Sequence, residues 1–290
     1  MVPCFAIDDI ITPKKFLLSG LWYGPKRAKR AVIFVHGLGG SMWSRSTVLR
    51  QLADPRTAVL TFNNRGHDKV AFIARAGKNH HTDTPGGAAH EVFTDCIDDI
   101  EGAINFVRKQ GIKDIFLIGH STGCQKSIYW ASRKGGRGVK GIVLLAPVSD
   151  YAAALKHDRR GKLARLTKIA RTLVRAGKPH AFMPGSILND GSLNDAQRFL
   201  SLNTPDSAET IFPYEQKGKR PQTLQKVTRP ILVLWAGADE YADRPAEEIA
   251  NWFDRNIKSA HRVVVIPKAL HSFKGAKRRV VGAIRKFMDA

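Results

Sequence analysis

Short runs of apolar, often β-branched residues alternate along this chain with longer segments in which apolar positions recur every three or four residues. The short runs have the length of buried strands, and the longer segments have the period of helices that pack on one face. This alternation is typical of an α/β protein whose mostly parallel central sheet is flanked by helices. We predict strands near residues 16–22, 31–36, 58–63, 114–119, 140–146, 230–236 and 262–267, and helices over 90–110, 122–134, 243–257 and 275–288.

The alternation stops between residues 150 and 228, where polar helical segments and turn clusters such as Pro184-Gly185 replace the apolar runs. We therefore expect a core made of residues 1–150 and 229–290, with a helical cap inserted over residues 151–228. Basic side chains with interleaved leucines over 156–178 predict one amphipathic helix with a strongly basic face. We expect this helix to form part of the cap, with some of its arginines near the opening of the site.

A nucleophile is indicated by Gly119-His120-Ser121-Thr122-Gly123, which lies directly between a predicted strand and a predicted helix. A serine at such a sharp turn adopts a strained backbone, and the flanking glycines let neighbouring chain segments approach closely. The turn also directs a helix N-terminus at the reacting centre, where negative charge would develop on a carbonyl oxygen. Ser121 is the candidate nucleophile, and the Thr122 N–H is a candidate oxyanion donor.

A second oxyanion donor is expected from the turn after an earlier strand. His36-Gly37-Leu38-Gly39-Gly40 follows the predicted strand at 31–36, and its glycines permit a tight turn that exposes the Leu38 N–H. Phosphate-binding loops are similarly rich in glycine. The chain has no Gly-Lys-Ser/Thr after this turn, so a nucleotide-binding P-loop is disfavoured.

A serine nucleophile needs a base, and the base needs an orienting acid. Asp239 follows the predicted strand at 230–236, and His271 follows the one at 262–267, so both face the same edge of a parallel sheet as Ser121. The order serine, aspartate, histidine is that of the α/β-hydrolase triad. Lower-ranked alternatives are Glu240 or Asp150 as the acid and His261 as the base. His261 precedes its strand and so belongs at the opposite edge.

These segments resemble those of α/β-hydrolase-fold serine hydrolases over nearly the whole chain. The resemblance implies a carboxylesterase-like nucleophile, an acyl-enzyme and release by water, but the fold also hosts thioesterases, lactonases and other hydrolases. The run from Gly119 to Gln125 also resembles the branch that contains fungal siderophore (fusarinine C) esterases. The matching segments are His36-Gly37-Leu38-Gly39-Gly40, Asn64-Arg65-Gly66-His67-Asp68, Gly119-His120-Ser121-Thr122-Gly123, Gly237-Ala238-Asp239 and Leu270-His271-Ser272-Phe273.

The chain carries 47 basic and 25 acidic residues, a formal charge of +22, which raises the question of a nucleic-acid binder. Residues 1–150, 151–228 and 229–290 contribute +9, +8 and +5, so the excess is spread along the chain rather than gathered in one stripe. This pattern favours a generally basic surface over a nucleic-acid site. A non-catalytic protein that binds an anionic ligand or nucleic acid remains the alternative. Candidate substrate-binding residues are His36, Arg159, Arg160 and Arg165.

The remaining signals favour a cofactor-free enzyme that acts on a small-molecule ester. Three cysteines form no Cys-x-x-Cys pair, and His80, His81 and His90 lack the spacing of metal ligands, so we expect no metal site and a solvated loop around these histidines. His36 and His67 are expected to bond main-chain atoms. Apolar runs are too short for a membrane span, and no secretory signal is evident, so we expect a cytoplasmic protein. The sequence does not define an oligomeric state.

Overall fold

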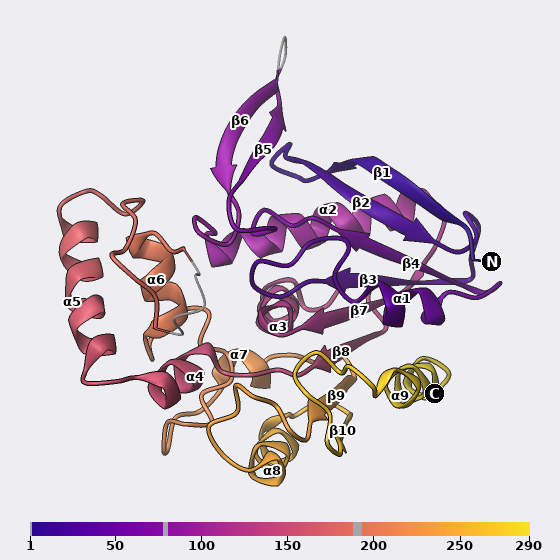
Figure 1. Ribbon diagram of the computed structural model, residues 1–290. Coiled ribbons are helices and arrows are strands. Elements are labelled where there is room, and N and C mark those ends of the chain that lie inside the picture. Colours follow the sequence, from indigo (N-terminus) through magenta and orange to yellow (C-terminus); the bar gives the residue numbers. More distant parts are fainter. Residues whose placement is uncertain (1, 78–80, 188–192) are drawn as a thin grey trace.

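The computed structural model of the protein describes residues 2–77, 81–187 and 193–290. Its centre is an eight-stranded sheet with the strand order β1-β2-β4-β3-β7-β8-β9-β10 (Figure 1). The first two strands join the sheet in antiparallel fashion, and every pairing from β4 to β10 is parallel. These strands are β1 (Cys4–Ile11), β2 (Leu17–Tyr23), β3 (Arg30–Val35), β4 (Thr57–Phe62), β7 (Asp114–His120), β8 (Gly141–Leu145), β9 (Ile231–Ala236) and β10 (His261–Ile266).

The expected fold class, a mostly parallel sheet flanked by helices, is confirmed, and all seven predicted strands are present. The central strands are buried on both faces, which is why they read as unbroken apolar runs rather than as alternating patterns. One face packs against α2 (Cys96–Lys109), preceded by a short 3₁₀ turn (Phe93–Asp95), together with α3 (Thr122–Lys134) and α8 (Ala246–Asn256). The other face packs against α1 (Ser46–Leu52) and α9 (Lys277–Met288).

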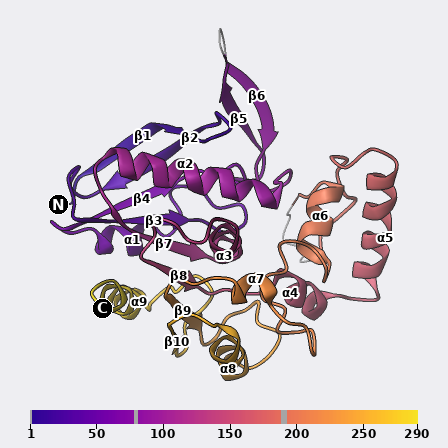
Figure 2. The same cartoon turned by 180° about the vertical axis from the view of Figure 1, so that it is seen from behind.

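Helix α1 and two features of the strands were not predicted from the sequence. The edge strand β1 is largely exposed, so its residues carry no buried apolar pattern. A separate antiparallel hairpin of β5 (Ala71–Ala76) and β6 (His81–Gly86) projects away from the sheet in both views (Figures 1 and 2). His81 therefore begins a strand, where a loop was expected, and His80 lies outside the described residues.

The insertion contains α4 (Asp150–His157), α5 (Lys162–Arg175), α6 (Ala196–Asn203) and the single turn α7 (Gln222–Gln225). Figures 1 and 2 show α6 between α5 and the core, on the side of the molecule away from both chain termini. The single basic helix expected over 156–178 is wrong, because the chain turns between α4 and α5. Arg160 and Gly161 adopt left-handed conformations there, with φ of 56° and 67°, and such angles end a right-handed helix. No helix in the described ranges is long and apolar enough to cross a bilayer.

Close packing of α3 on the sheet depends on Gly123. A Cβ atom at this position would collide with the main-chain oxygen of Val35 in β3, and neither backbone can move without shifting its element. The main chain of α3 therefore sits directly on the end of β3. This approach fixes the start of α3, and with it the turn that carries Ser121.

We expect Gly123→Ala to lower the free energy of unfolding by about 2 kcal/mol or more, because the added methyl overpacks a backbone contact. Gly282→Ala in α9 is the matched control, since a Cβ there meets no atom within 4 Å and alanine favours a helix. Chemical denaturation of both variants measures the difference. Equal stabilities would show that the core absorbs the methyl group and that Gly123 does not fix the position of α3.

Candidate active site

Ser121 lies at the turn between β7 and α3 in a strained conformation. Its φ and ψ are 55° and −127°, a region that side chains rarely occupy. A Cβ on Gly119 would collide with the main chain of Gly123, so the turn can close only with glycine at Gly119. The Ser121 N–H donates to the Leu145 oxygen of β8 at 3.0 Å, which ties the turn to the sheet. The sequence motif thus forms the expected strand-to-helix turn.

Asp239 and His271 form a hydrogen-bonded pair at the carboxyl ends of β9 and β10. The distance from His271 Nδ1 to Asp239 Oδ2 is 2.8 Å, and the Asp239 side chain is completely buried. The other Asp239 oxygen accepts from the Tyr241 N–H at 3.0 Å, so the carboxylate is held from both sides. In this arrangement Nδ1 carries the proton, and Nε2 of a neutral His271 is free to act as a base.

The alternative acid and base candidates have other partners. Glu240 accepts from the main-chain N–H of His271 at 2.9 Å, so it holds the loop rather than the ring. Asp150 accepts from the Gln125 side chain at 2.7 Å. His261 lies at the start of β10, where its Nε2 is 3.3 Å from Asp254, and it lines a separate groove at the opposite edge of the sheet.

Two rings flank His271. The centroids of His120 and Tyr241 lie 5.0 and 4.9 Å from the centroid of the His271 ring. Burial lowers the pKa of His120 well below its usual range, so His120 is neutral, and its Nε2–H donates to the main-chain oxygen of His271 at 3.0 Å. His120 therefore packs beneath the serine turn and positions the histidine loop.

The loop after β3 lies against the serine. A Cβ on Gly37 would be 2.8 Å from the Ser121 Cβ and 3.4 Å from its Oγ, so the Gly37 main chain is in direct contact with Ser121. Leu38 lines the same pocket as Ser121, which is compatible with its expected oxyanion role. The Leu38 and Thr122 amides stay predictions as oxyanion donors.

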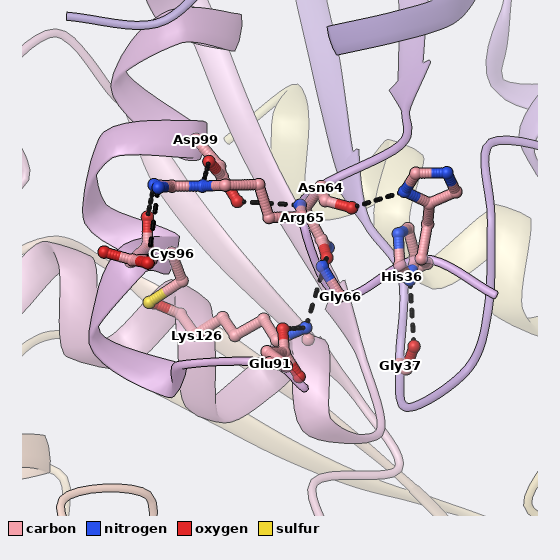
Figure 3. Close-up of polar contacts among 12 residues, drawn as sticks. His36, Gly37, Asn64, Arg65, Gly66, Glu91, Cys96, Asp99 and Lys126 are labelled. Atoms are coloured by element: carbon pink, nitrogen blue, oxygen red, sulfur yellow. Dashed lines mark hydrogen bonds and ion pairs between the residues drawn. The ribbon is translucent and has the colours of Figure 1, made fainter. Parts of the chain in front are cut away.

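His36 is not placed for substrate binding. It is completely buried and outside the pocket lining, and its Nδ1 donates to the Gly37 oxygen at 2.9 Å (Figure 3). Burial, aided by the nearby charge of Lys126, lowers the pKa of His36 to about 3, so the ring stays neutral. His36 and His67 both bond main-chain oxygens, as expected for residues that shape the turns.

Ser121 and His271 open into one pocket of about 280 Å³. The core contributes Arg45, Asp150 and Tyr241 to its lining, and the insertion contributes part of the wall. Sequence reasoning did not assign a role in the pocket to Arg45 or to any residue of the insertion outside its basic helix. The insertion residues that line the pocket are Ala153, Ala154, Ser186, Ile187, Asn194, Leu202 and Asn203.

The basic residues proposed for substrate binding do not reach this pocket. Arg159, Arg160 and Arg165 are exposed to solvent, and none of them lines it. The apolar side of α5 packs against α6 and its neighbours through Leu163 and Leu166, which leaves the arginines on the outer side of the insertion. The turn between α4 and α5 redirects the basic stretch away from the position that one continuous helix would have given it.

Arg65 anchors the loop after β4 to α2 (Figure 3). Its Nε donates to Asp99 at 2.7 Å, its Nη2 to Asp98 at 3.1 Å, and its guanidinium lies over the Phe16 ring at 4.3 Å. The adjacent Gly66 has no room for a side chain, because the Glu91 carboxylate lies directly against it. The Asn64 to Asp68 segment thus serves as a rigid base for the site rather than as part of the chemistry.

A buried ion network lies behind the pocket. Lys126 of α3 and Arg198 of α6 are completely buried, and both pair with Glu91, at 2.5 and 2.8 Å. Arg198 also binds Glu209 at 2.5 Å. Burial opposes the charge of Glu91, but Lys126 and Arg198 outweigh burial and lower its pKa. Sequence patterns could not assign these partners, because they lie on elements far apart in the chain.

Asp150 borders this network as a third carboxyl group. Lys126 and Arg198 pair with Glu91 and Glu209, and Asp150 forms no ion pair with any residue that the structure describes. Burial and the charge of Glu209 raise its pKa to about 8, although Arg198 and Lys126 act in the opposite direction. The surroundings of Asp150 therefore favour the protonated form of a carboxyl group in the pocket lining.

A protein-family model described as "Protein of unknown function (DUF1749)" matches residues 91–288, about two thirds of the chain. The chain belongs to the DUF1749 family. The match includes the serine turn, the insertion, and the Asp239 and His271 loops. The N-terminal strands and the loop after β3 lie outside it.

Solved structures show the fold of this DUF1749 protein. Est1E from Butyrivibrio proteoclasticus, solved with ferulic acid bound, superposes with a TM-score of 0.62 at 20% identity over 96% of each chain. The α/β hydrolase GrgF from Penicillium sp. sh18 gives a TM-score of 0.65 at 14% identity, over 99% of this chain and 100% of that one. The DUF1749 protein therefore has the α/β-hydrolase fold.

A curated relative matches part of the sequence. The protein named "Putative esterase/lipase 2" of Mycoplasma genitalium is 26% identical over 137 residues, which is 47% of this chain. The match spans 45% of the length of that relative. The resemblance to the fusarinine C esterase branch stays a prediction.

The raised pKa of Asp150 predicts a pH-dependent stability. The pKa of Asp150 is about 8 in the folded protein, against an ordinary value of 3.8 in the unfolded chain. The contribution of Asp150 to the free energy of unfolding is therefore greatest at pH values below 3.8. This contribution is lost as the pH rises through about 8. Urea unfolding should be measured at several pH values from 3.8 to about 8. The difference in the free energy of unfolding between the wild type and Asp150→Asn should shrink as the pH increases.

The exposed Asp206 supplies the matched control. Asp206→Asn removes the same charge at the surface, and its stability should follow that of the wild type at every pH. A constant difference between the wild type and Asp150→Asn across the window would contradict the burial of a protonated carboxyl group at this position.

Proposed function

We propose that this DUF1749 protein hydrolyses carboxylic esters through an acyl-enzyme formed on Ser121. The observation that carries the proposal is the hydrogen-bonded pair of His271 and Asp239 beside a strained serine in one pocket. The α/β-hydrolase fold and the partial match to a protein named as an esterase or lipase are in keeping with this chemistry. A protein that only binds ligands has no physical need for three such groups in this arrangement.

In the proposed mechanism, Ser121 Oγ attacks the ester carbonyl while His271 Nε2 takes its proton. Asp239 keeps the other ring nitrogen protonated and stabilises the imidazolium that forms. The carbonyl oxygen becomes an oxyanion, and the Leu38 and Thr122 N–H groups donate to it. Collapse of the tetrahedral intermediate breaks the ester C–O bond, and His271 returns the proton to the leaving alcohol. Water then attacks the acyl-enzyme by the same steps, and the acid is released.

The pocket favours a small acyl group with polar substituents. Its volume of about 280 Å³ is at the low end for small-molecule sites. Arg45, Asp150 and Asn194 give it polar walls, which suit oxygen-bearing or nitrogen-bearing groups better than a long alkyl chain. Thioesters, lactones and hydroxamate siderophore esters are alternative substrates of the same triad. A panel of these compounds, with products identified by mass spectrometry, distinguishes them.

Ser121→Ala and His271→Ala should each lower turnover of p-nitrophenyl butyrate by roughly 10⁴-fold to 10⁶-fold, because a nucleophile and its base fail as a unit. Ser186→Ala is the control, since Ser186 lines the same pocket but has no place in the mechanism. It should keep activity within about tenfold of the wild type. Near-normal turnover by the Ser121 variant would exclude the covalent mechanism.

A second pair of variants separates the proposed acid from its neighbour. Asp239→Asn misorients the His271 ring and should reduce kcat strongly, though less than loss of the serine. Glu240→Gln keeps the length of the side chain and a carbonyl oxygen that can accept from the His271 N–H, so its effect should be small. Steady-state kinetics on one ester measures both. A larger loss in the Glu240 variant would assign the orienting role to Glu240.

A further inference from the structure

Outside the proposed active site, two histidines and an aspartate meet at the seam between the core and the insertion. His90 Nδ1 and His180 Nδ1 lie 3.1 and 2.8 Å from the same oxygen, Asp195 Oδ2. The three atoms all lie within 4.8 Å of one another. The two histidines come from different parts of the chain, since His90 follows the β5–β6 hairpin and His180 follows α5.

The two nitrogen-to-oxygen separations are close to those of ligands around one metal ion. Two ligand atoms placed about 2.0 Å from a tetrahedral Zn²⁺ lie about 3.3 Å apart. The two nitrogen-to-oxygen distances are within about half an ångström of that value, so small rotations of the rings would make room for an ion. Two imidazoles and one carboxylate also form a set of ligands that binds borderline transition metals in preference to Mg²⁺ or Ca²⁺.

The surroundings hold the donors in place. Asp195 is completely buried, and its second oxygen, Oδ1, accepts from the Arg198 N–H at 2.7 Å as the N-cap of α6. This bond fixes the carboxylate and leaves Oδ2 directed at the histidines, which is the role of an outer hydrogen bond around a metal ligand. The centroids of the His90 and Phe182 rings lie 4.9 Å apart, and the Asp195 N–H donates to the Ala89 oxygen. The segment that carries His90 is therefore joined to the segments that carry His180 and Asp195.

We propose that His90, His180 and Asp195 bind a divalent transition-metal ion of the Zn²⁺ class. Each neutral imidazole then carries its proton on Nε2, and its Nδ1 lone pair binds the ion. Three protein ligands leave a fourth position for water. The ion would join the loop before α2 to the start of α6, next to Asn194 in the pocket wall. Sequence spacing predicted no such site, because two of its three ligands lie 90 or more residues from His90.

The test is a calorimetric titration of chelator-treated protein with Zn²⁺. The wild type should bind one equivalent, and His180→Gln should bind at least about tenfold more weakly. His180 is the best position for the change, because 62% of its side chain is exposed and its replacement disturbs little packing. His157→Gln, at another exposed histidine of the insertion, is the matched control and should bind like the wild type.

Two further readouts make the result decisive. Co²⁺ added to the wild type should give the visible absorption of a low-coordinate site, and Zn²⁺ should raise its thermal unfolding temperature, with both effects lost in His180→Gln. An excess of Mg²⁺ or Ca²⁺ should not displace the metal. The proposal is overturned if the wild type shows no saturable binding, or if His180→Gln binds as tightly. The titration works equally well on Ser121→Ala protein, so its outcome is independent of the proposed hydrolase activity.

Discussion

The position of the insertion depends on one set of buried charges. Lys126 on α3 and Arg198 on α6 share the carboxylate of Glu91, and neither cation is exposed to solvent. Loss of a single partner would leave a buried charge without compensation, which is far more costly than the net gain from the intact pairs. The network therefore acts mainly as a constraint on geometry. It requires α6 to lie where Arg198 can reach Glu91, beside the core (Figure 1), and α6 in turn contributes Leu202 and Asn203 to the pocket lining.

The same network links the two halves of the site. Glu91 presses on Gly66, whose segment is anchored by Arg65, and Lys126 is one helical turn beyond the start of the helix that begins at the serine turn (Figure 3). The field of Lys126 also helps to keep His36 neutral under the Gly37 turn. Charges that never touch a substrate thus hold the loop, the turn and the insertion in register.

Local sequence signals predicted the core well, because each depends on neighbouring residues. Buried parallel strands give unbroken apolar runs, and a serine turn needs its glycines within two positions. The exposed strand β1 and the polar strand β6 gave no such signal. The break before α5 did have a local signal in the sequence, namely Gly161 and Asp158. Gly161 adopts a left-handed conformation, and the Asp158 side chain accepts from the Leu163 N–H. The buried ion network and the three proposed metal ligands join distant segments, which no local pattern can reveal.

The net charge of +22 describes the surface of this protein rather than its site. Inside the described structure, the cations of the Glu91 network are matched by carboxylates, and Arg65 is matched by the aspartates of α2. The arginines among the described residues of the insertion do not line the pocket. The insertion instead adds short polar side chains to the pocket wall, such as Ser186 and Asn194. The core supplies the residues of the proposed chemistry, and the insertion supplies this wall, so a change in the insertion can alter the shape of the pocket without altering those residues.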